Sequence, residues 1–274
     1  MDFSISKVFW APLQVLAARA IGRLENPAHR DALIPLLHSP DLLVRRAAMG
    51  ALAQMRAPFE YAALLQAERD ASVRAVIYEA IGHCWDKLDN YAEARFYYRK
   101  ASHLNPDDSK LYYKLACTYI NEEQWSQAVK QLEAAMRIHS MQPEYNLAMG
   151  ECKMQLGEFK EAIQFFSNVV RIRPRNISSW EALIRCLYNA EYFEEALDQV
   201  EAAIKITNGK PLFGFYLAAV LFALGRNREG LLQLENAMAK APKLLKKLVE
   251  LNPVILQYQP VVDIIARYKK NKSI

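Results

Sequence analysis

Small and aromatic residues recur along the chain at a fixed interval of 34 positions. Small residues follow one another at this interval at Ala94, Ala128, Ala162, Ala196 and Gly230. An aromatic residue stands three positions before each of the four alanines, at Tyr91, Trp125, Phe159 and Phe193. A period of about 20 to 50 residues is typical of stacked structural units. The pattern therefore predicts a repeat protein.

A second series in the same register indicates that the repeats are helical. Seven residues after the first series stand Ala101, Ala135, Val169, Ala203 and Ala237. A spacing of seven keeps both series on one face of an α-helix. Prolines at 106, 174 and 242 close alternate units, where a helix must stop. We therefore expect one helical hairpin in each unit.

The register resembles the tetratricopeptide repeat, a 34-residue helix-turn-helix unit with small residues in its second helix. The best matches are YYKLACTYINEEQWSQAVKQLEAAMRI, from Tyr112, and MGECKMQLGEFKEAIQFFSNVVRIRP, from Met149. We count five units, which begin at Ala75, Ser109, Pro143, Ile177 and Pro211. Departures from the family pattern at Asn146, Ile184, Gly214 and Gly230 put the tightness of packing in the last two units in question.

Close approach of the two helices in a unit requires a small side chain opposite a large one. The small positions in the first helices are Gly82, Ala116, Gly150 and Ala218. Gly157 and Gly225 fall between the helices of their units, where a residue in a left-handed conformation is favoured.

Before residue 75 the pattern changes. DLLVRRAAMGALAQM, from Asp41, and ASVRAVIYEAIGHCW, from Ala71, share a Val-Arg start about 30 residues apart, and LQVLAARAIGRL, from Leu13, looks like an earlier copy. These segments resemble short HEAT-like repeats. A helix near Val73 to Trp85 would end one repeat system and open the other, so we expect one continuous stack without a flexible linker.

Beyond Pro242 the period stops, and KLLKKLVEL and VVDIIARYKK are amphipathic segments that would cover the apolar edge of the last repeat. The resemblances imply an all-α fold, a right-handed α-solenoid of stacked antiparallel helix pairs. We expect HEAT-like repeats over residues 1–74, five tetratricopeptide repeats over 75–244, and capping helices with a basic tail over 245–274.

Charge and hydropathy restrict the partners. Residues 238–274 hold eight of the 35 basic residues and two of the 30 acidic ones, so the body of the chain is nearly neutral. A neutral body lacks the basic stripe that nucleic acid requires. Pro12, Gln14 and Arg19 interrupt the apolar stretch 8–20, and no run approaches the roughly 20 apolar residues that span a bilayer. We expect a cytoplasmic protein without a membrane span.

The usual catalytic and cofactor motifs are absent: GxxxxGK[ST], GxGxxG, HExxH, GxSxG and CxxC. We therefore expect no enzymatic activity, no cofactor and no metal site. Four cysteines recur near the repeat period, at Cys84, Cys117, Cys152 and Cys186. Equivalent helices lie about 8 to 10 Å apart, too far for disulfides, so these residues are interpreted as reduced structural thiols.

The resemblance implies that the first helices line a concave surface, and that their residues outside the packing contacts meet a partner. The register gives His83, Asp86, Lys110, Tyr113, Lys114, Asn121, Glu151, Met154, Glu181, Arg185, Tyr188, Asn189, Phe215 and Phe222. Lys114 and Arg185 are expected to lie outside the inter-helix contacts. Glu79 and His83 stand where some relatives carry lysine and asparagine to hold a terminal carboxylate, so that recognition is not expected.

The predicted function is that of a protein-binding scaffold or adaptor that holds a peptide or a partner helix in this groove. The alternative is a subunit that binds a small molecule or lipid, or assists catalysis, through the aromatic-rich region 213–222. The first helix, expected over residues 4–24, is apolar on more than one face, although a terminal repeat should be polar outside. We expect this end to meet a partner, another copy of the chain or further repeats.

Overall fold

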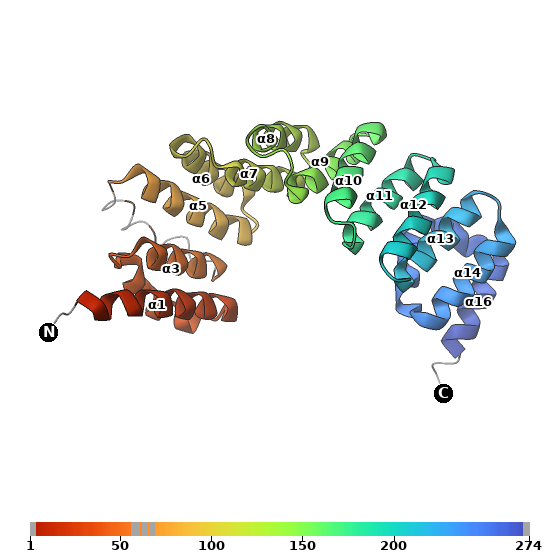
Figure 1. The fold of residues 1–274 in the computed structure, drawn as a ribbon, viewed down its shortest axis with the longest axis horizontal. Helices are drawn as coiled ribbons and strands as arrows, with labels where there is room; N and C mark the ends of the chain where they lie inside the picture. The colour runs from red at the N-terminus through yellow and green to blue at the C-terminus, as the bar shows by residue number, and fades with distance from the viewer. Residues whose placement is uncertain (1–3, 56–60, 62–64, 66–68, 271–274) are drawn as a thin grey trace. The chain divides into compact units, whose positions relative to one another are not determined.

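The computed structural model describes residues 4–55, 61, 65 and 69–270 of the chain. In this part of the chain all regular structure is helical, with α-helices joined by turns and short 3₁₀-helices, and no strand occurs (Figure 1). None of the described helices is both long enough and apolar enough to cross a bilayer. The prediction of an all-helical repeat fold is confirmed.

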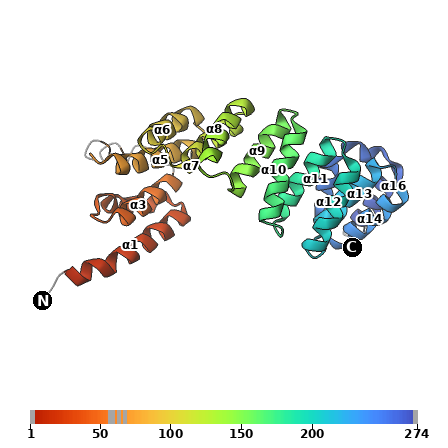
Figure 2. The ribbon, with the colours of Figure 1, turned by 45° about the horizontal axis from the view of Figure 1, so that its top comes forward.

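The chain divides into two compact units, Met1–Ser140 and Met141–Ile274. The first unit contains α1 (Ser4–Leu24), α2 (Arg30–Leu33), α3 (Leu42–Gln54), α5 (Ala71–Lys87), α6 (Tyr91–Leu104), α7 (Ser109–Asn121) and α8 (Trp125–Ile138). The second contains α9 (Pro143–Gln155), α10 (Phe159–Ile172), α11 (Ile177–Asn189), α12 (Phe193–Ile206), α13 (Pro211–Ala223), α14 (Asn227–Lys240), α15 (Leu245–Leu251) and α16 (Gln259–Lys270). Within each unit successive helices pack as hairpins (Figures 1 and 2).

Aspartate caps begin the two helices that carry the Val-Arg pattern. The carboxylate of Asp41 accepts the N–H of Leu43 at 2.7 Å, and Asp70 accepts the N–H of Ser72 at 2.8 Å. Because Asp70 caps α5, this helix begins four residues before the unit start predicted at Ala75. It packs on α3 and on α6, as expected of a helix shared by both kinds of repeat, and that assignment stays a prediction.

The arginines of this pattern fasten each helix to the preceding segment. The guanidinium of Arg45 donates to the carbonyl of Ser39 at 3.0 Å, and that of Arg74 donates to the carbonyl of Leu65 at 2.9 Å. Both bonds satisfy a main-chain oxygen that precedes the helix. The shared Val-Arg start therefore has a structural function in both copies.

In the tetratricopeptide-like part, α7, α9, α11 and α13 begin at the predicted unit starts. The small positions face large rings. A Cβ added at Gly82 would lie 2.7 Å from the ring of Tyr98, and one added at Gly150 would lie 2.6 Å from the ring of Phe166. These contacts place the second helix of each pair directly against the backbone of the first.

The predicted left-handed glycines are confirmed, at Gly157 (φ +78°) and Gly225 (φ +74°). The same position in the other three units is occupied by Asp89, Glu123 and Glu191, whose φ angles are +57°, +57° and +61°. All five hairpins therefore use one turn geometry. The residue type at that position does not change the geometry.

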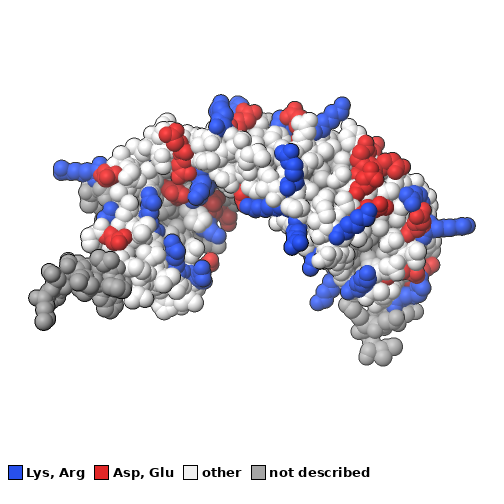
Figure 3. Space-filling view, viewed as in Figure 1, with Lys and Arg blue, Asp and Glu red and all other residues white. Residues whose placement is uncertain are grey.

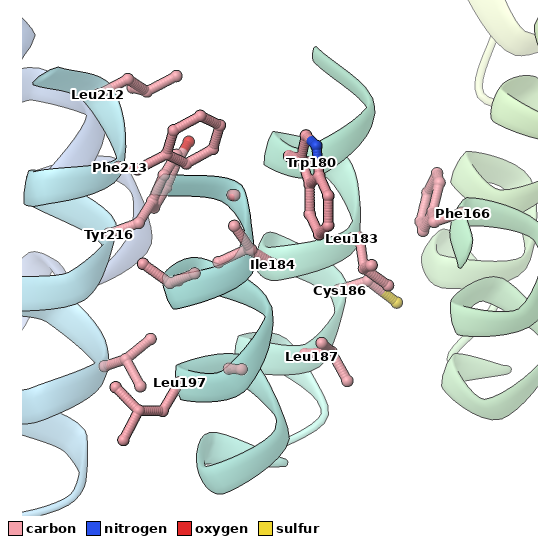
Figure 4. Packing of buried hydrophobic residues seen from close by; sticks show 14 of the residues in the cluster. Phe166, Trp180, Leu183, Ile184, Cys186, Leu187, Leu197, Leu212, Phe213 and Tyr216 are labelled. Carbon is pink, nitrogen blue, oxygen red and sulfur yellow. The ribbon is translucent and has the colours of Figure 1, made fainter. Parts of the chain in front are cut away.

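The last two units are packed as closely as the others, which answers the question raised by their departures from the family pattern. Ile184 is fully buried in a cluster with Trp180, Leu183 and Phe213, as Figure 4 shows. A Cβ added at Gly230 would lie 2.8 Å from the ring of Phe222, so glycine is required there by the ring opposite. Both positions therefore remain closely packed although their residues depart from the family pattern.

The predicted capping segments form α15 and α16 at the end of the second unit. The first packs on α13 and the second on α14, so together they occupy the place of one more helix pair. Leu248, Ile255, Val261 and Ile264 bury their side chains in the same cluster as Phe215. The apolar edge of the fifth unit is thereby covered. The domain boundaries at 74/75 and 244/245, and the single stack across the two compact units, stay predictions.

Candidate partner-binding surface

In the first compact part of the chain (unit 1, Met1–Ser140), the first helices of successive repeats border an open pocket of about 410 Å³. We call this the α3–α5–α7 pocket, since side chains of these helices line it together with Asn105 and Asp108 from the loop before α7. Arg46 and Gly50 come from α3, Glu79 and His83 from α5, and Lys110 and Lys114 from α7; small and apolar residues lie between them. The sequence predicted three of these residues: His83, Lys110 and Lys114.

An ion pair joins neighbouring first helices inside this pocket. The ammonium of Lys114 donates to Glu79 at 2.7 Å, and both side chains are about one-third exposed. The expectation that Lys114 lies outside the inter-helix contacts is therefore wrong, because its side chain is long enough to reach the helix of the preceding repeat. The pair neutralises one positive and one negative charge of the pocket.

Two titratable groups of α5 are shifted toward their neutral forms. Burial, together with the positive charges of Lys114 and Lys87, lowers the pKa of His83 to about 4, so the imidazole is uncharged at pH 7. Burial raises the pKa of Asp86, against the influence of the same two lysines. His83 therefore offers the pocket a neutral ring that both donates and accepts hydrogen bonds.

Three of the four cysteines are buried and all four are free thiols. Cys84, Cys152 and Cys186 stand two residues after the small position of their helices and face the core, whereas Cys117 follows its small position by one residue and is partly exposed. Burial raises the pKa of Cys117 despite a hydrogen bond from Tyr113. The burial of three of them agrees with the interpretation as structural residues. No group of three or more metal-ligating side chains occurs in the described part of the chain.

In unit 2 the predicted charged residues bind one another. Arg185 donates to Glu151 at 2.7 Å across neighbouring first helices, so it too is not outside the inter-helix contacts. Glu181 accepts the hydroxyl of Tyr216 at 2.9 Å and pairs with Lys247 of α15 at 2.8 Å. Burial alone would raise the pKa of Glu181, but these two donors outweigh it and lower the pKa. Helix α15 thus lies against part of this surface and leaves a smaller pocket of about 290 Å³.

Three predicted residues are not available to a partner. Phe215 is fully buried, and Met154 and Phe222 are buried as well. Phe215 and Phe222 pack in the cluster that α15 and α16 close, and the ring of Phe222 lies against Gly230. These are corrections to the sequence prediction, which took register positions as surface positions. The capping helices cover Phe215 and Phe222, and the 34-residue period gave no signal for that cover. Met154 is buried instead in the cluster that contains Phe166 and Leu183.

The remaining predicted residues keep some exposure. Lys110, Asn121 and Asn189 are exposed. Asp86, Tyr113 and Tyr188 are partly buried, and the ring of Tyr188 meets that of Phe193 at 5.2 Å. On the face that Figure 3 shows, basic side chains are scattered over both units; acidic ones form a patch near α11 and α12 and also occur over the first unit. Among the acidic residues of that stretch, Glu191, Glu194, Glu195 and Asp198 are exposed.

Arg46, Gly50 and Ser72 were missed by the sequence prediction. The 34-residue register was projected only from residue 75 onward, so residues before that point were left out. A signal was present, since Gly50 interrupts the middle of a predicted helix and Arg46 stands one turn before it. Glycine at such a position costs roughly 1 kcal/mol relative to alanine unless the site needs it.

A second open surface lies at the N-terminal end. Residues of α1 and of the segment from Pro35 to Leu43 border an open apolar groove of about 1170 Å³. Leu13, Leu16 and Leu43 are 58%, 61% and 64% exposed. This groove lies at the first helix, which the sequence predicted to be apolar on more than one face. What meets it stays a prediction.

Helix pairs with aspartate-capped Val-Arg starts, followed by 34-residue hairpins with small-to-large packing, define the class. The chain is a helical repeat protein in which HEAT-like repeats precede tetratricopeptide-like repeats. The family model of HEAT repeats matches residues 11–82. That of the anaphase-promoting complex, cyclosome, subunit 3 matches residues 87–169.

Solved structures with the same fold include MamA and YrrB. The crystal structure of MamA protein has a TM-score of 0.57 and 18% identity over 63% of this chain and 94% of that one. MamA from Desulfovibrio magneticus RS-1 has a TM-score of 0.56 and 14% identity over 61% and 94%. YrrB, a TPR protein with an unusual peptide-binding site, has a TM-score of 0.52 and 19% identity over 73% and 94%. These likenesses concern the fold.

Proposed function

We propose that this chain is a non-enzymatic scaffold or adaptor in the cytoplasm. Its first helices bind a peptide segment or a helix of a partner protein. The observation that carries the proposal is the α3–α5–α7 pocket, an open site whose polar side chains are not consumed by the repeat core. The peptide-binding site named for YrrB, which shares the fold, supports the same kind of ligand. The alternative site at residues 213–222 is disfavoured because most of that helix is buried.

The test is affinity capture from an extract of the source cell with matched variants. One variant carries Arg46→Trp and Lys110→Trp, which place bulk at exposed positions of two helices that line the pocket. The control carries Gln127→Trp and Glu195→Trp, at equivalent exposed positions of two second helices. We expect the first variant to lose most of the captured partner and the control to retain it, because a bulky ring obstructs only the face that binds.

Equal capture by both variants would assign binding to another surface and contradict the proposal. Mass spectrometry of the purified protein under native conditions separates the alternative function. A small molecule retained by the folded chain at stoichiometric amounts would favour the alternative. A protein that retains no small molecule and captures a partner through its first helices would favour the scaffold function.

A further inference from the structure

Gly50 differs from the other eight glycines of the chain. A Cβ at Gly22, Gly82, Gly150 or Gly230 would come within 3.0 Å of another atom, and one at Gly214 would lie 3.2 Å from Ala237. Gly157, Gly209 and Gly225 have positive φ angles. At Gly50 a Cβ would meet nothing within 4 Å, and its φ is not in the left-handed region. Neither packing nor backbone conformation explains this glycine.

The position is one where glycine destabilises the free protein. Gly50 lies inside the 13-residue helix α3, is exposed, and borders the α3–α5–α7 pocket. In an exposed helix interior glycine is the least favourable residue apart from proline. The absent side chain does, however, leave the helix backbone open to close approach from the pocket. A peptide ligand whose main chain lies across α3 at Gly50 would require such an opening.

The charges of the pocket indicate the chemistry of that ligand. Glu79 is paired with Lys114, and the carboxylate of Asp108 caps α7 by accepting the N–H of Lys110 at 3.0 Å. His83 is neutral at pH 7. The side chains of Arg46 and Lys110 are exposed and form no ion pair within the described part of the chain. The pocket lining therefore has three cations, Arg46, Lys110 and Lys114, against two carboxylates, Glu79 and Asp108, so its net charge is positive. Arg46 and Lys110 lie one on each side of α5.

We propose that the α3–α5–α7 pocket binds an extended acidic peptide segment, whose main chain crosses α3 at Gly50 and whose carboxylates meet Arg46 and Lys110. The inference rests on the proposed function and names the partner's chemistry. An extended peptide fits better than a helix, because a main chain wrapped in its own side chains cannot approach Gly50. The site is distinct from terminal-carboxylate capture, since the carboxylates are those of side chains.

The test uses the full chain and three ten-residue peptides, (Glu-Ala)₅, (Gln-Ala)₅ and (Lys-Ala)₅, each with the dye on its N-terminus and an amidated C-terminus. Fluorescence anisotropy at low and moderate salt gives the dissociation constants. We expect the glutamate peptide to bind at least roughly tenfold more tightly than the other two, with an affinity that falls as salt rises. Equal affinities for the three peptides, or no binding of the glutamate peptide at millimolar concentration, would overturn the proposal.

Two matched charge variants locate the binding. Arg46→Glu with Lys110→Glu should weaken the glutamate peptide roughly tenfold or more, because attraction becomes repulsion at two points. Lys130→Glu with Arg137→Glu makes the same charge change on the exposed surface of α8, outside the pocket. It should retain affinity within about threefold. The same loss in both variants would show non-specific attraction and overturn the assignment to this pocket.

Gly50→Gln tests the approach to the backbone. The substitution should raise the melting temperature by a few degrees, because glutamine favours a helix more than glycine does. It should also weaken the glutamate peptide about fivefold or more by obstructing α3. Higher stability with unchanged affinity would overturn the role given to Gly50. If the glutamate peptide does not bind but the tryptophan substitutions still abolish capture of the partner, the acidic ligand is wrong and the scaffold function stands.

Discussion

At the residue scale, the fold depends on pairs of small and large side chains that face each other across a hairpin. Gly150 and Phe166 form one such pair, and Gly82 and Tyr98 form another. In the unit between them the register places Leu132 opposite Ala116. Leu132 is smaller than the rings at the equivalent positions, and Ala116 is larger than the glycines that those rings face. The size of one member therefore determines the size that the other can have.

Gly150→Ala should lower the free energy of unfolding by about 1–3 kcal/mol, because the added methyl lies inside the contact distance of the Phe166 ring. Phe166→Leu alone leaves a cavity and also destabilises the protein. The double variant reproduces the Ala116 and Leu132 pair, so it should recover much of the combined loss. Chemical denaturation of the four proteins measures the coupling. Strictly additive losses would show that the two residues do not determine each other.

His83 should titrate far below an ordinary histidine, near pH 4. Its pKa is lowered in the folded protein, so protonation favours the unfolded chain and stability falls as pH drops below about 6.5. Histidine carbon chemical shifts measured against pH give the folded value directly. In His83→Gln the part of the acid-induced loss that begins near pH 6.5 should diminish. A folded-state pKa of His83 above 6 would contradict the described burial of this ring.

At the scale of elements, each hairpin turn uses one residue in the left-handed region whatever its type. Glu191 is exposed there, with φ at +61°. Glu191→Gly should stabilise the protein by roughly 0.5–1 kcal/mol, since glycine adopts this conformation without strain and the gain exceeds the added freedom of the unfolded chain. Gly157→Ala is the reverse change in another turn and should cost about 1 kcal/mol. Thermal melts of both variants provide the comparison, and shifts of the same sign would contradict the shared turn geometry.

The capping helix α15 is held to the first helices of unit 2 by Lys247 and Glu181. The pKa of Glu181 is lowered in the folded protein, so this stabilisation is present above its ordinary pKa of 4.5 and is lost as pH falls below that value. Glu181→Gln should remove it at pH 7 and speed amide exchange in α15 about fivefold, which corresponds to roughly 1 kcal/mol. Glu250→Gln removes only a more exposed contact of Lys247, at 3.4 Å, and should change exchange little. Equal effects of the two substitutions would contradict the special part given to Glu181.

The sequence predicted the elements well because their determinants are local. Capping aspartates, a 34-residue register and turn glycines each act within a few residues, and α7, α9, α11 and α13 begin where the register placed them. The surface was predicted less well. Burial of Phe215 depends on α15 and α16, which lie outside the repeat period. The ion pairs of Lys114 and Arg185 depend on long side chains that contact residues 35 and 34 positions earlier in the sequence.

At the scale of the whole molecule, the helices of the hairpins fall into two groups with different tasks. Second helices supply the rings of Tyr98 and Phe166 that pack on first helices, whereas in the last hairpin Phe222 of the first helix packs on Gly230 of the second. The first helices α5 and α7 carry polar side chains that packing does not use. The α3–α5–α7 pocket extends this arrangement into the HEAT-like part, where the tetratricopeptide register gave no prediction. Binding should therefore occur at the first helices, and the charged side chains of this pocket should contribute to it.

The most direct test is a map of contacts along one hairpin. A photo-reactive amino acid would replace single exposed or partly exposed residues of α7 and α8, namely Lys110, Tyr113, Asn121, Gln127, Lys130 and Glu133. The captured partner would be irradiated with each variant, and the cross-linked products would be identified by mass spectrometry. We expect cross-links from the three α7 positions and none above background from the three α8 positions. Cross-links from α8 with none from α7 would contradict this expectation.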